Sequence, residues 1–360
     1  MNALPNRKRS HYMEWAKLSS AAPFNLATSG LTNVLLTEFS LRLEDLEITG
    51  GGYGYGPLLE RIAAHTGAPL ECVVTAAGTS MANHLAMATL LEPGDEVVLE
   101  EPAYGLLLDV LDYLGARVRR VARHFEDDFA ISLGEMEAAM TPATRLVVLT
   151  NLHNPTGVLL PTETLRAIGE MAQRVGALVL VDEVYLEMLF DQGGGSFSLG
   201  NNFIVTSSLT KAYGLSGLRC GWILAPAELA RRMWLLNDLF AATAPHPAER
   251  MSVLAFDQLA RFRARARERL ATNRPLLDAF LDSRDDLECV RPPAGTVVFP
   301  RLRKGDAASF FRLLREKYET SVVPGDFFEM PQHFRLGIGG EMENVRGGLE
   351  RLGAALDQFA

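Results

Sequence analysis

The sequence is poor in cysteine and in long hydrophobic runs. Its three cysteines, Cys72, Cys220 and Cys289, are far apart and lack the spacing of a metal finger or a redox motif, which favours a reduced protein over a disulfide framework. No stretch of about 18 uninterrupted apolar residues is present to span a bilayer, and the first residues lack the apolar core of a signal peptide. We therefore expect a soluble, cytoplasmic protein.

Basic residues are also scarce relative to acidic ones. Lysine and arginine number 35 against 44 aspartates and glutamates, which gives a net charge of -9 at pH 7. Nucleic acids and anionic membranes bind clustered lysine and arginine, and the basic start at residues 7–9 is too short to reverse the balance. The sequence predicts no nucleic-acid partner, no membrane partner and no metal site.

What the sequence does contain is an alternation of short β-prone runs and helical segments between residues 72 and 225. The seven runs are CVVT, EVVL, ARVRRV, RLVVLT, ALVLVD, FIVTSS and CGWILA, and the helical stretches begin near Thr79, Tyr104, Ser132 and Thr162. Several runs are almost continuously apolar, as strands covered on both faces are. This pattern predicts an α/β fold with a mostly parallel seven-stranded sheet flanked by helices.

A smaller α+β domain is predicted to follow a long helical pattern that runs from Pro247 to about Ser283. The 360 residues, 48% of them hydrophobic, suffice for one large domain and a companion. We place the large domain at residues 50–260 and the small domain at residues 1–49 and 261–360. The first 49 residues show no clear period and are interpreted as an arm with short helices.

Lys211 is the first candidate site residue. It follows the apolar run FIVTSSLT and precedes a glycine-punctuated loop that contains Arg219. An amine at the end of a buried strand, with a second cation nearby, is disfavoured as ammonium and becomes a nucleophile toward an aldehyde. A strand followed by a polar turn explains the same stretch, so this residue alone leaves both interpretations open.

Residues just after the other strands are further candidates, because ligands of such sheets sit at the carboxyl ends of the strands. Gly78, Thr79 and Ser80 lie between a strand and a helix, a setting that suits a bound phosphate or an ordinary helix cap. Asn154, in the sequence NPTG, would hydrogen-bond a ligand oxygen or simply form a tight turn.

Four more side chains are candidates, and three of them have a second interpretation. Asp182 ends the run ALVLVD, where a buried carboxylate needs a partner such as a cationic ring nitrogen, or else caps the next helix. Tyr185 would then reach the hydroxyl of the same ring. Tyr104 would lay its ring on a flat ligand or cover the edge of the core, and Arg335 in FRLGIG would bind a carboxylate or form a structural salt bridge. Their conjunction in one chain favours a ligand site.

The motifs NPTG, DEVY and SLTK, followed by GLR with Arg219 eight positions after Lys211, occur in the order and approximate spacing of a known family. The chain resembles the fold type I pyridoxal-phosphate enzymes, specifically the class I/II aminotransferases typified by aspartate aminotransferase, from about residue 50 to its end. The resemblance implies that Lys211 forms the internal aldimine with pyridoxal 5'-phosphate and moves the proton between the substrate Cα and the cofactor C4'. Asp182 would pair with the pyridine nitrogen, and Tyr185 and Asn154 with the ring oxygen.

The resemblance also implies which residues hold the rest of the cofactor. The phosphate would be bound by the backbone at Ala77, Gly78 and Thr79 and by the side chains of Ser208 and Arg219. Tyr104 would stack on the face of the ring.

The substrate side of the implied site is less complete. Arg335 would grip the substrate α-carboxylate, with Asn154 and Gly30 beside it. The family loop that sends a tyrosine into the partner subunit is shortened and glycine-rich here, so Tyr53, or else Tyr55, would take that role. The second arginine of members that accept dicarboxylates has no match, and aspartate is therefore not predicted as a substrate.

The activity that the resemblance implies is transfer of an amino group between an amino acid and a 2-oxo acid by a homodimer with shared active sites. A lyase or cyclase that uses the same carbanion chemistry is the alternative. A pyridoxal-phosphate-binding regulator is a remote third, because the chain is acidic and shows no basic DNA-binding module.

Overall fold

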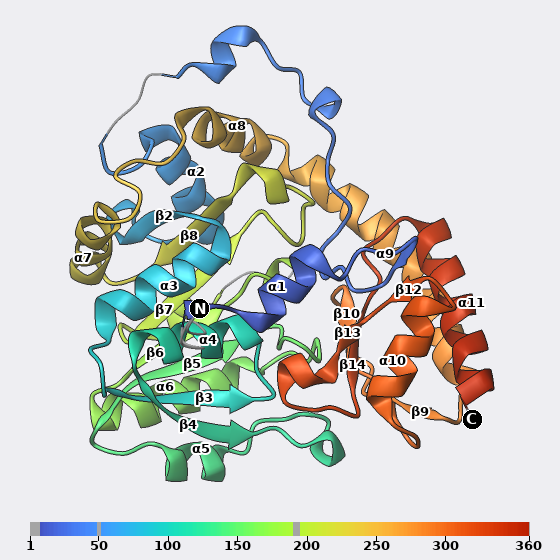
Figure 1. Ribbon diagram of the computed structural model, residues 1–360. Coiled ribbons are helices and arrows are strands. Elements are labelled where there is room, and N and C mark those ends of the chain that lie inside the picture. Colours follow the sequence, from blue (N-terminus) through green and yellow to red (C-terminus); the bar gives the residue numbers. More distant parts are fainter. Residues whose placement is uncertain (1–7, 49–51, 190–194, 360) are drawn as a thin grey trace, which may run out of the picture.

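The computed structural model describes residues 8–48, 52–189 and 195–359 (Figure 1). Its centre is a seven-stranded sheet with the strand order β2-β8-β7-β6-β5-β3-β4, in which β8 is antiparallel to both neighbours and all other pairs are parallel. The strands are β2 (Val73–Ala77), β3 (Glu96–Glu101), β4 (Arg117–Ala122), β5 (Thr144–Thr150), β6 (Leu178–Asp182), β7 (Phe203–Ser208) and β8 (Cys220–Leu224). The predicted α/β fold with a mostly parallel sheet is confirmed.

Helices cover both faces of this sheet, which is why its strands are nearly continuously apolar. Leu146 and Val148 of β5 pack toward one layer of helices, and Val147 and Leu149 pack toward the other. The first layer holds α3 (Gly78–Leu90), α4 (Gly105–Leu114) and α7 (Ala227–Asn237); the second holds α2 (Gly56–Thr66), α5 (Leu133–Ala139), α6 (Thr162–Val175) and α8 (His246–Phe256).

A second hydrophobic core lies in the C-terminal part of the chain, drawn orange and red in Figure 1. It is built from α9 (Leu259–Asp282), α10 (Ala307–Glu316), α11 (Met342–Phe359) and the short strands β9 (Leu287–Glu288), β10 (Val297–Val298), β11 (Arg301–Leu302), β12 (Thr320–Ser321), β13 (Val323–Pro324) and β14 (Phe334–Gly337). The N-terminal strand β1 (Phe24–Asn25) pairs with β12 in parallel. The exact domain boundaries at residues 50 and 260 stay a prediction.

The long helical pattern after Pro247 forms two helices, not one. α8 ends at Phe256 and α9 begins at Leu259. Between them, the Gln258 N–H donates to Ala255 O at 3.0 Å, so the chain makes a tighter turn than that of an α-helix. Gln258 itself has the non-helical angles φ -112° and ψ 10°. Both helices bury an apolar face, so their sequence period continues across the break and hides it.

Residues 8–48 form an arm with short helices. α1 (His11–Leu18) begins at Ser10, whose Oγ accepts from the Met13 N–H at 3.2 Å, and lies against α4. Two single turns follow, η2 (Leu36–Glu38) and η3 (Leu43–Leu46). Within the described ranges no helix has the length and apolar character needed to cross a membrane, and no group of three or more metal-ligating side chains occurs.

Candidate active site

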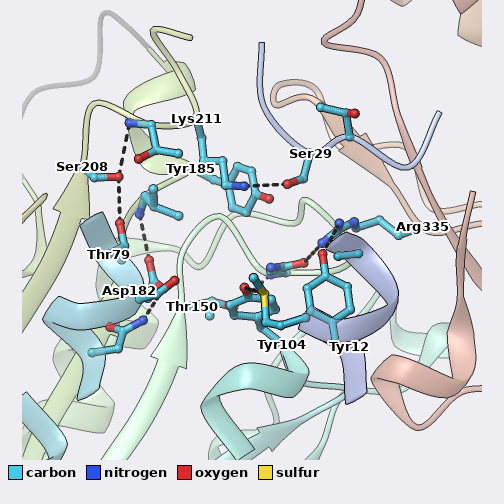
Figure 2. Close-up of a pocket in the computed structure, with 18 of the residues that line it drawn as sticks. Tyr12, Ser29, Thr79, Tyr104, Thr150, Asp182, Tyr185, Ser208, Lys211 and Arg335 are labelled. Carbon is cyan, nitrogen blue, oxygen red and sulfur yellow. Dashed lines mark hydrogen bonds between the residues drawn. The ribbon is translucent and has the colours of Figure 1, made fainter. Parts of the chain in front are cut away.

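A cavity of about 320 Å³ lies where the carboxyl ends of β5, β6 and β7 meet α1, α3, α4 and β14 (Figure 2). Ten residues named as candidates from the sequence line it: Thr79, Ser80, Tyr104, Asn154, Asp182, Tyr185, Ser208, Lys211, Arg219 and Arg335. Figure 2 shows Thr79 and Ser208 on one side, Arg335 and Tyr12 on the other, and Lys211 between them. The fold thus brings strand ends that are distant in the sequence to one cavity.

Lys211 lies three residues after Ser208, the last residue of β7, and its Nζ donates to Ser29 Oγ at 2.8 Å. Burial lowers the pKa of this amine, and the charges of Arg335 and Arg219 act in the same direction, whereas Tyr12 and Asp182 act against them. A lowered pKa enlarges the fraction of neutral amine, which is the nucleophilic form. The surroundings of Lys211 therefore suit covalent chemistry with an aldehyde better than a role in a polar turn.

Asp182 at the end of β6 is buried and only partly compensated. Its Oδ2 accepts from Asn83 Nδ2 at 2.7 Å and its Oδ1 from the Val184 N–H at 3.1 Å. Burial raises the pKa of this carboxyl to about 6, although these hydrogen bonds and the charge of Lys211 act against the rise. A cationic N–H placed at the carboxylate would supply the missing compensation.

The end of the cavity formed by α3 and β7 is rich in donors. Thr79 Oγ1 donates to Ser208 Oγ at 2.8 Å, and the Thr210 N–H donates to the same oxygen at 3.3 Å. The exposed guanidinium of Arg219 donates only to backbone carbonyls, those of Ala77 at 3.0 Å and Ser216 at 3.3 Å. No carboxylate among the described residues pairs with Arg219, so its charge is available to an anion at the start of α3.

Gly78 allows this cluster to form. It has φ +75°, and a Cβ at this position would overlap the guanidinium of Arg219. The Gly78 N–H donates to Arg219 O at 2.8 Å and is therefore already used. Ala77 and Gly78 lie behind Arg219 and do not line the cavity, so their contribution is to position Arg219.

Arg335 is a buried cation without a counter-charge. The side chain is 1% exposed, and it donates from Nη1 to Asn154 Oδ1 at 2.8 Å and from Nη2 to Tyr12 OH at 2.9 Å. Its Nε has no hydrogen-bond partner, and within the described ranges no carboxylate pairs with it. The alternative of a structural salt bridge is therefore wrong, and a guanidinium buried at a cavity wall needs an anion from outside.

A buried network holds Asn154 in place beside Arg335. The Asn154 N–H donates to Thr150 Oγ1 at 2.9 Å, and Thr150 donates through its N–H and Oγ1 to Glu100 Oε1 at 2.6 and 2.7 Å. Glu100 also forms a fully buried ion pair with Arg123 at 2.8 Å. His153 bonds Pro102 O at 2.9 Å, and burial holds its pKa well below the usual value, so it is structural.

The two predicted tyrosines occupy different walls. Tyr185 is buried near Lys211, and burial raises the pKa of its phenol. The ring of Tyr104, just before α4, meets the ring of Tyr12 edge-on at 5.4 Å between centroids, and its hydroxyl donates to Met13 Sδ at 3.7 Å. Both phenols keep their protons as hydrogen-bond donors.

Besides Ala77 and Gly78, two further predicted residues do not line the cavity. A Cβ on Gly30 would lie 3.3 Å from Lys211 Cα, so this glycine packs behind the lysine. Tyr53 lies elsewhere, where its hydroxyl donates to Asp238 Oδ2 at 3.1 Å and its ring is 5.9 Å from that of Trp234. Residues 49–51 of the same loop are outside the described residues, and a role of Tyr53 in a partner subunit stays a prediction.

Several lining residues were missed by sequence reasoning. Tyr12, Trp15 and Ser29 belong to the N-terminal segment, whose residues show no period that would mark them. Asn83 had a usable signal, because it lies four residues after Thr79 and thus on the same face of α3.

Comparison with known proteins agrees with this site. The family model described as aminotransferase class I and II matches residues 18–352. The chain is 30% identical to the arginine–pyruvate transaminase AruH of Pseudomonas aeruginosa over 74% of this chain and 70% of that protein. It also superposes on a PLP-dependent aminotransferase from Streptococcus suis (TM-score 0.91, 26% identity, 99% of both chains) and on the PLP-dependent cyclase OrfR (TM-score 0.88, 26% identity, 100% of both chains).

The fold and the site together define a fold type I enzyme that depends on pyridoxal 5'-phosphate. Three groups of the site match three parts of this cofactor. The amine of Lys211, with its lowered pKa, matches the aldehyde, and the buried carboxyl of Asp182 matches the ring nitrogen. The guanidinium of Arg219, at the start of α3, matches the phosphate. The chain belongs to the aminotransferase class I and II family, and it is a PLP-dependent aminotransferase.

Proposed function

We propose that this enzyme moves the amino group of an amino acid to a 2-oxo acid in the cavity between Arg219 and Arg335. The observation that carries the proposal is the buried guanidinium of Arg335, which has no counter-charge and lies in the same cavity as Lys211 and Asp182. Both substrates of a transamination carry an α-carboxylate, so a single cationic site serves both halves of the reaction.

Each end of the cavity then has a separate task. Arg219, Ser208 and Thr79 would hold the phosphate, and Asp182 would keep a proton on the ring nitrogen. Pyridoxal phosphate, when bound, supplies a ring that withdraws electrons from the substrate Cα. At the other end Arg335 and Asn154 orient the α-carboxylate.

Lys211 would hold the cofactor aldehyde and carry the proton. Its Nζ, whose pKa is lowered by burial, is the one lysine amine among the described lining residues, and it would take a proton from the substrate Cα and return it. Tyr185 and Asn154 would donate hydrogen bonds to the ring oxygen. Burial of Tyr185 raises its pKa, which keeps it a donor.

Incubation of the holoenzyme with a panel of amino acids, followed at the cofactor's absorbance, tests the proposal. We expect loss of the aldehyde-form absorbance with the right donor, release of the matching 2-oxo acid, and its reversal by a second 2-oxo acid. The absence of any amino acid that converts the cofactor, together with no 2-oxo-acid-dependent turnover, would contradict transamination.

A cyclase is the second candidate, supported by the similarity to OrfR over the full length of both chains. Proton removal from Cα is common to both reactions, and the side chains that line the cavity serve either later step. Product analysis without added 2-oxo acid separates them. A cyclised amino acid, with no accumulation of the amino form of the cofactor, would favour the cyclase.

We also propose that the enzyme is a homodimer. The segment that carries η2 and η3 runs outside α2 and α8 (Figure 1). Leu43 of η3 is 89% exposed, and Leu239, just after α7, is 78% exposed. Large apolar side chains exposed to this extent would be covered by a contact with a second copy, which supports the proposal. Light scattering after gel filtration tests this, and a monomer at micromolar concentration with full activity would contradict it.

The cytoplasm is the proposed compartment. Support comes from Cys72, Cys220 and Cys289, which are all unpaired. Cell fractionation with detection of the protein in each fraction would test the proposal.

A further inference from the structure

A group of polar side chains outside the cavity connects the segments that carry Tyr185 and Lys211. Glu187 lies two residues after Tyr185, in the short turn η6 (Leu186–Leu189), and Tyr213 lies two residues after Lys211. The hydroxyl of Tyr213 donates to Glu187 Oε2 at 2.5 Å. Tyr185 and Lys211 are among the described lining residues of the cavity, whereas Glu187 and Tyr213 are not. The hydrogen bond therefore joins two cavity residues through the chain behind them.

His65 of α2 and Arg263 of α9 complete this group, which we call the Glu187 cluster. His65 Nε2 lies 2.9 Å from Glu187 Oε1, and Arg263 Nη2 lies 3.5 Å from His65 Nδ1. A guanidinium can only donate, so Nδ1 is the acceptor and Nε2 carries the proton that His65 donates to Glu187. The ring of His65 also meets the rings of Trp222 and Phe256 edge-on, at 6.0 and 5.6 Å between centroids. Packing against these rings fixes the donor that holds Glu187.

The charges in the Glu187 cluster favour a strong bond between Glu187 and Tyr213. Burial alone would raise the pKa of Glu187, but the hydrogen bonds from His65 and Tyr213 and the charge of Arg263 hold this pKa below its usual value. Burial and the negative charge of Glu187 raise the pKa of Tyr213. An ionised acceptor therefore meets a protonated phenol, and hydrogen bonds of this kind are short and about twice as strong as neutral ones.

Strand pairing ends before the chain reaches either cavity residue. β6 ends at Asp182, three residues before Tyr185, and β7 ends at Ser208, three residues before Lys211. Beyond β7 the loop of Lys211 is bonded to the N-terminal arm, where the Leu31 N–H donates to Lys211 O at 3.0 Å. The Glu187 cluster connects the same loop to the Tyr185 segment. The position of the lysine amine relative to the phenol therefore depends on this cluster.

We propose that Glu187 and Tyr213 are positioning residues, and that the bond between them sets where the Lys211 amine lies relative to Tyr185. The proposal rests on the role proposed for Lys211 above. Both ends of the bond belong to one chain, so it forms with or without a second subunit. A displaced amine should slow the steps that Lys211 performs and leave substrate binding at Arg335, on the other side of the cavity, unchanged.

Cofactor binding tests the proposal apart from turnover. Tyr213→Phe removes the hydroxyl and keeps the buried ring. In a fluorescence titration of the cofactor-free enzyme, we expect this variant to bind pyridoxal phosphate roughly tenfold more weakly than the wild type, because the amine no longer meets the aldehyde in the right geometry. Deoxypyridoxine phosphate, which lacks the aldehyde, should bind equally to both proteins. Unchanged binding of pyridoxal phosphate, or equal losses for the two ligands, would overturn the proposal.

Turnover by the holoenzyme provides a second measurement. Tyr213→Phe should lower kcat roughly 10- to 100-fold with KM unchanged. Glu187→Gln keeps one acceptor for the Tyr213 hydroxyl and should therefore lose less than Glu187→Ala. A rise in KM as large as the fall in kcat would contradict a positioning role. If the difference between the two cofactor ligands appears while no amino acid is transaminated, the positioning role stands and the transamination proposal alone fails.

Tyr318→Phe is the matched control for Tyr213→Phe. The hydroxyl of Tyr318 likewise donates a hydrogen bond to a side chain, to Gln358 Oε1 at 2.8 Å, but it lies outside the cavity. We expect both cofactor binding and kcat to match the wild type. Losses as large as those of Tyr213→Phe would show that the bond between Tyr213 and Glu187 has no special role.

Discussion

Asp182 is an acid whose proton is held more tightly in the folded chain than in the unfolded one. Its pKa is raised from 3.8 to about 6 by burial. The stability linked to this proton is therefore present below pH 4 and is lost as the pH rises through about 6. A rise of about two pKa units corresponds to about 3 kcal/mol.

The Asp182→Asn variant without cofactor should consequently be more stable than the wild type at pH 8, by up to about 3 kcal/mol, with a difference that shrinks toward pH 5. Urea unfolding across this range measures it. A difference that stays constant with pH would show that the buried charge is not its cause. As a control, added pyridoxal phosphate should stabilise the wild type more than the variant.

Lys211 offers the most direct test of the cofactor assignment. Lys211→Ala should bind pyridoxal phosphate through Arg219 and Ser208 yet lack the absorbance of a lysine-bound cofactor, and turnover should fall by at least about a thousandfold, since both the covalent bond and the proton carrier are lost. Spectroscopy and a coupled assay measure the two effects. Persistence of the lysine-bound absorbance would mean that another lysine holds the cofactor.

Arg335 is expected to act on substrates only through their carboxylate. Arg335→Gln removes a charged hydrogen-bond donor, worth roughly 1.5–3 kcal/mol, and should lower kcat/KM for amino acids roughly 10- to 150-fold. The slow reaction of a primary amine without a carboxylate should not change. Arg346→Gln, at an exposed arginine of α11, is the control. Equal losses for the amine and the amino acid would contradict the assignment.

Chain geometry decides which site residues could be predicted from the sequence. Asp182 and Ser208 are the last residues of β6 and β7, and Lys211 follows Ser208 by three residues. Parallel strands place their carboxyl ends at one edge of the sheet. Tyr12 and Ser29 reach the same cavity from an aperiodic segment through long-range packing that no local pattern encodes. The missing counter-charge of Arg335 likewise depends on the tertiary structure.

At the scale of elements, the junction between β2 and α3 depends on one residue without a side chain. Gly78→Ala should push aside Arg219, because the added Cβ overlaps its guanidinium. In addition, an alanine at φ +75° is strained by about 1–2 kcal/mol, which lowers the population of this backbone conformation about tenfold. We expect at least roughly tenfold weaker binding of pyridoxal phosphate in a fluorescence titration. Gly217→Ala is the matched control, since its Cβ would have nothing within 4 Å, and a similar loss there would contradict the explanation.

Secondary structure could be predicted where burial alone determines the pattern of apolar residues. The runs that became β5 and β6 are apolar throughout because both faces are covered, and α6 begins at Thr162 as predicted. The break at Asp257 between α8 and α9 and the antiparallel direction of β8 escaped prediction. Neither changes the apolar period along the chain, so only the packed structure reveals them.

At the scale of the whole molecule, the proposed homodimer predicts a sensitive surface. Leu43→Asp places a charge on a side chain that would be buried between two copies, and it should shift the enzyme toward monomers at micromolar concentration. Sedimentation velocity measures the shift. Leu18→Asp, at an exposed leucine of α1, is the control. An unchanged dimer for Leu43→Asp, or no dimer in the wild type, would contradict this surface.

The position of α1 in the chain has a practical consequence. The residues that would hold the cofactor lie between positions 77 and 219, whereas the lining residues Tyr12, Met13, Trp15, Ala16 and Ser20 occupy positions 12–20, just before β1 pairs with β12. This side of the cavity is therefore encoded in a separate stretch of the gene from the proposed cofactor contacts. A focused library that randomises only these five positions would change one side of the cavity and leave every proposed cofactor contact intact.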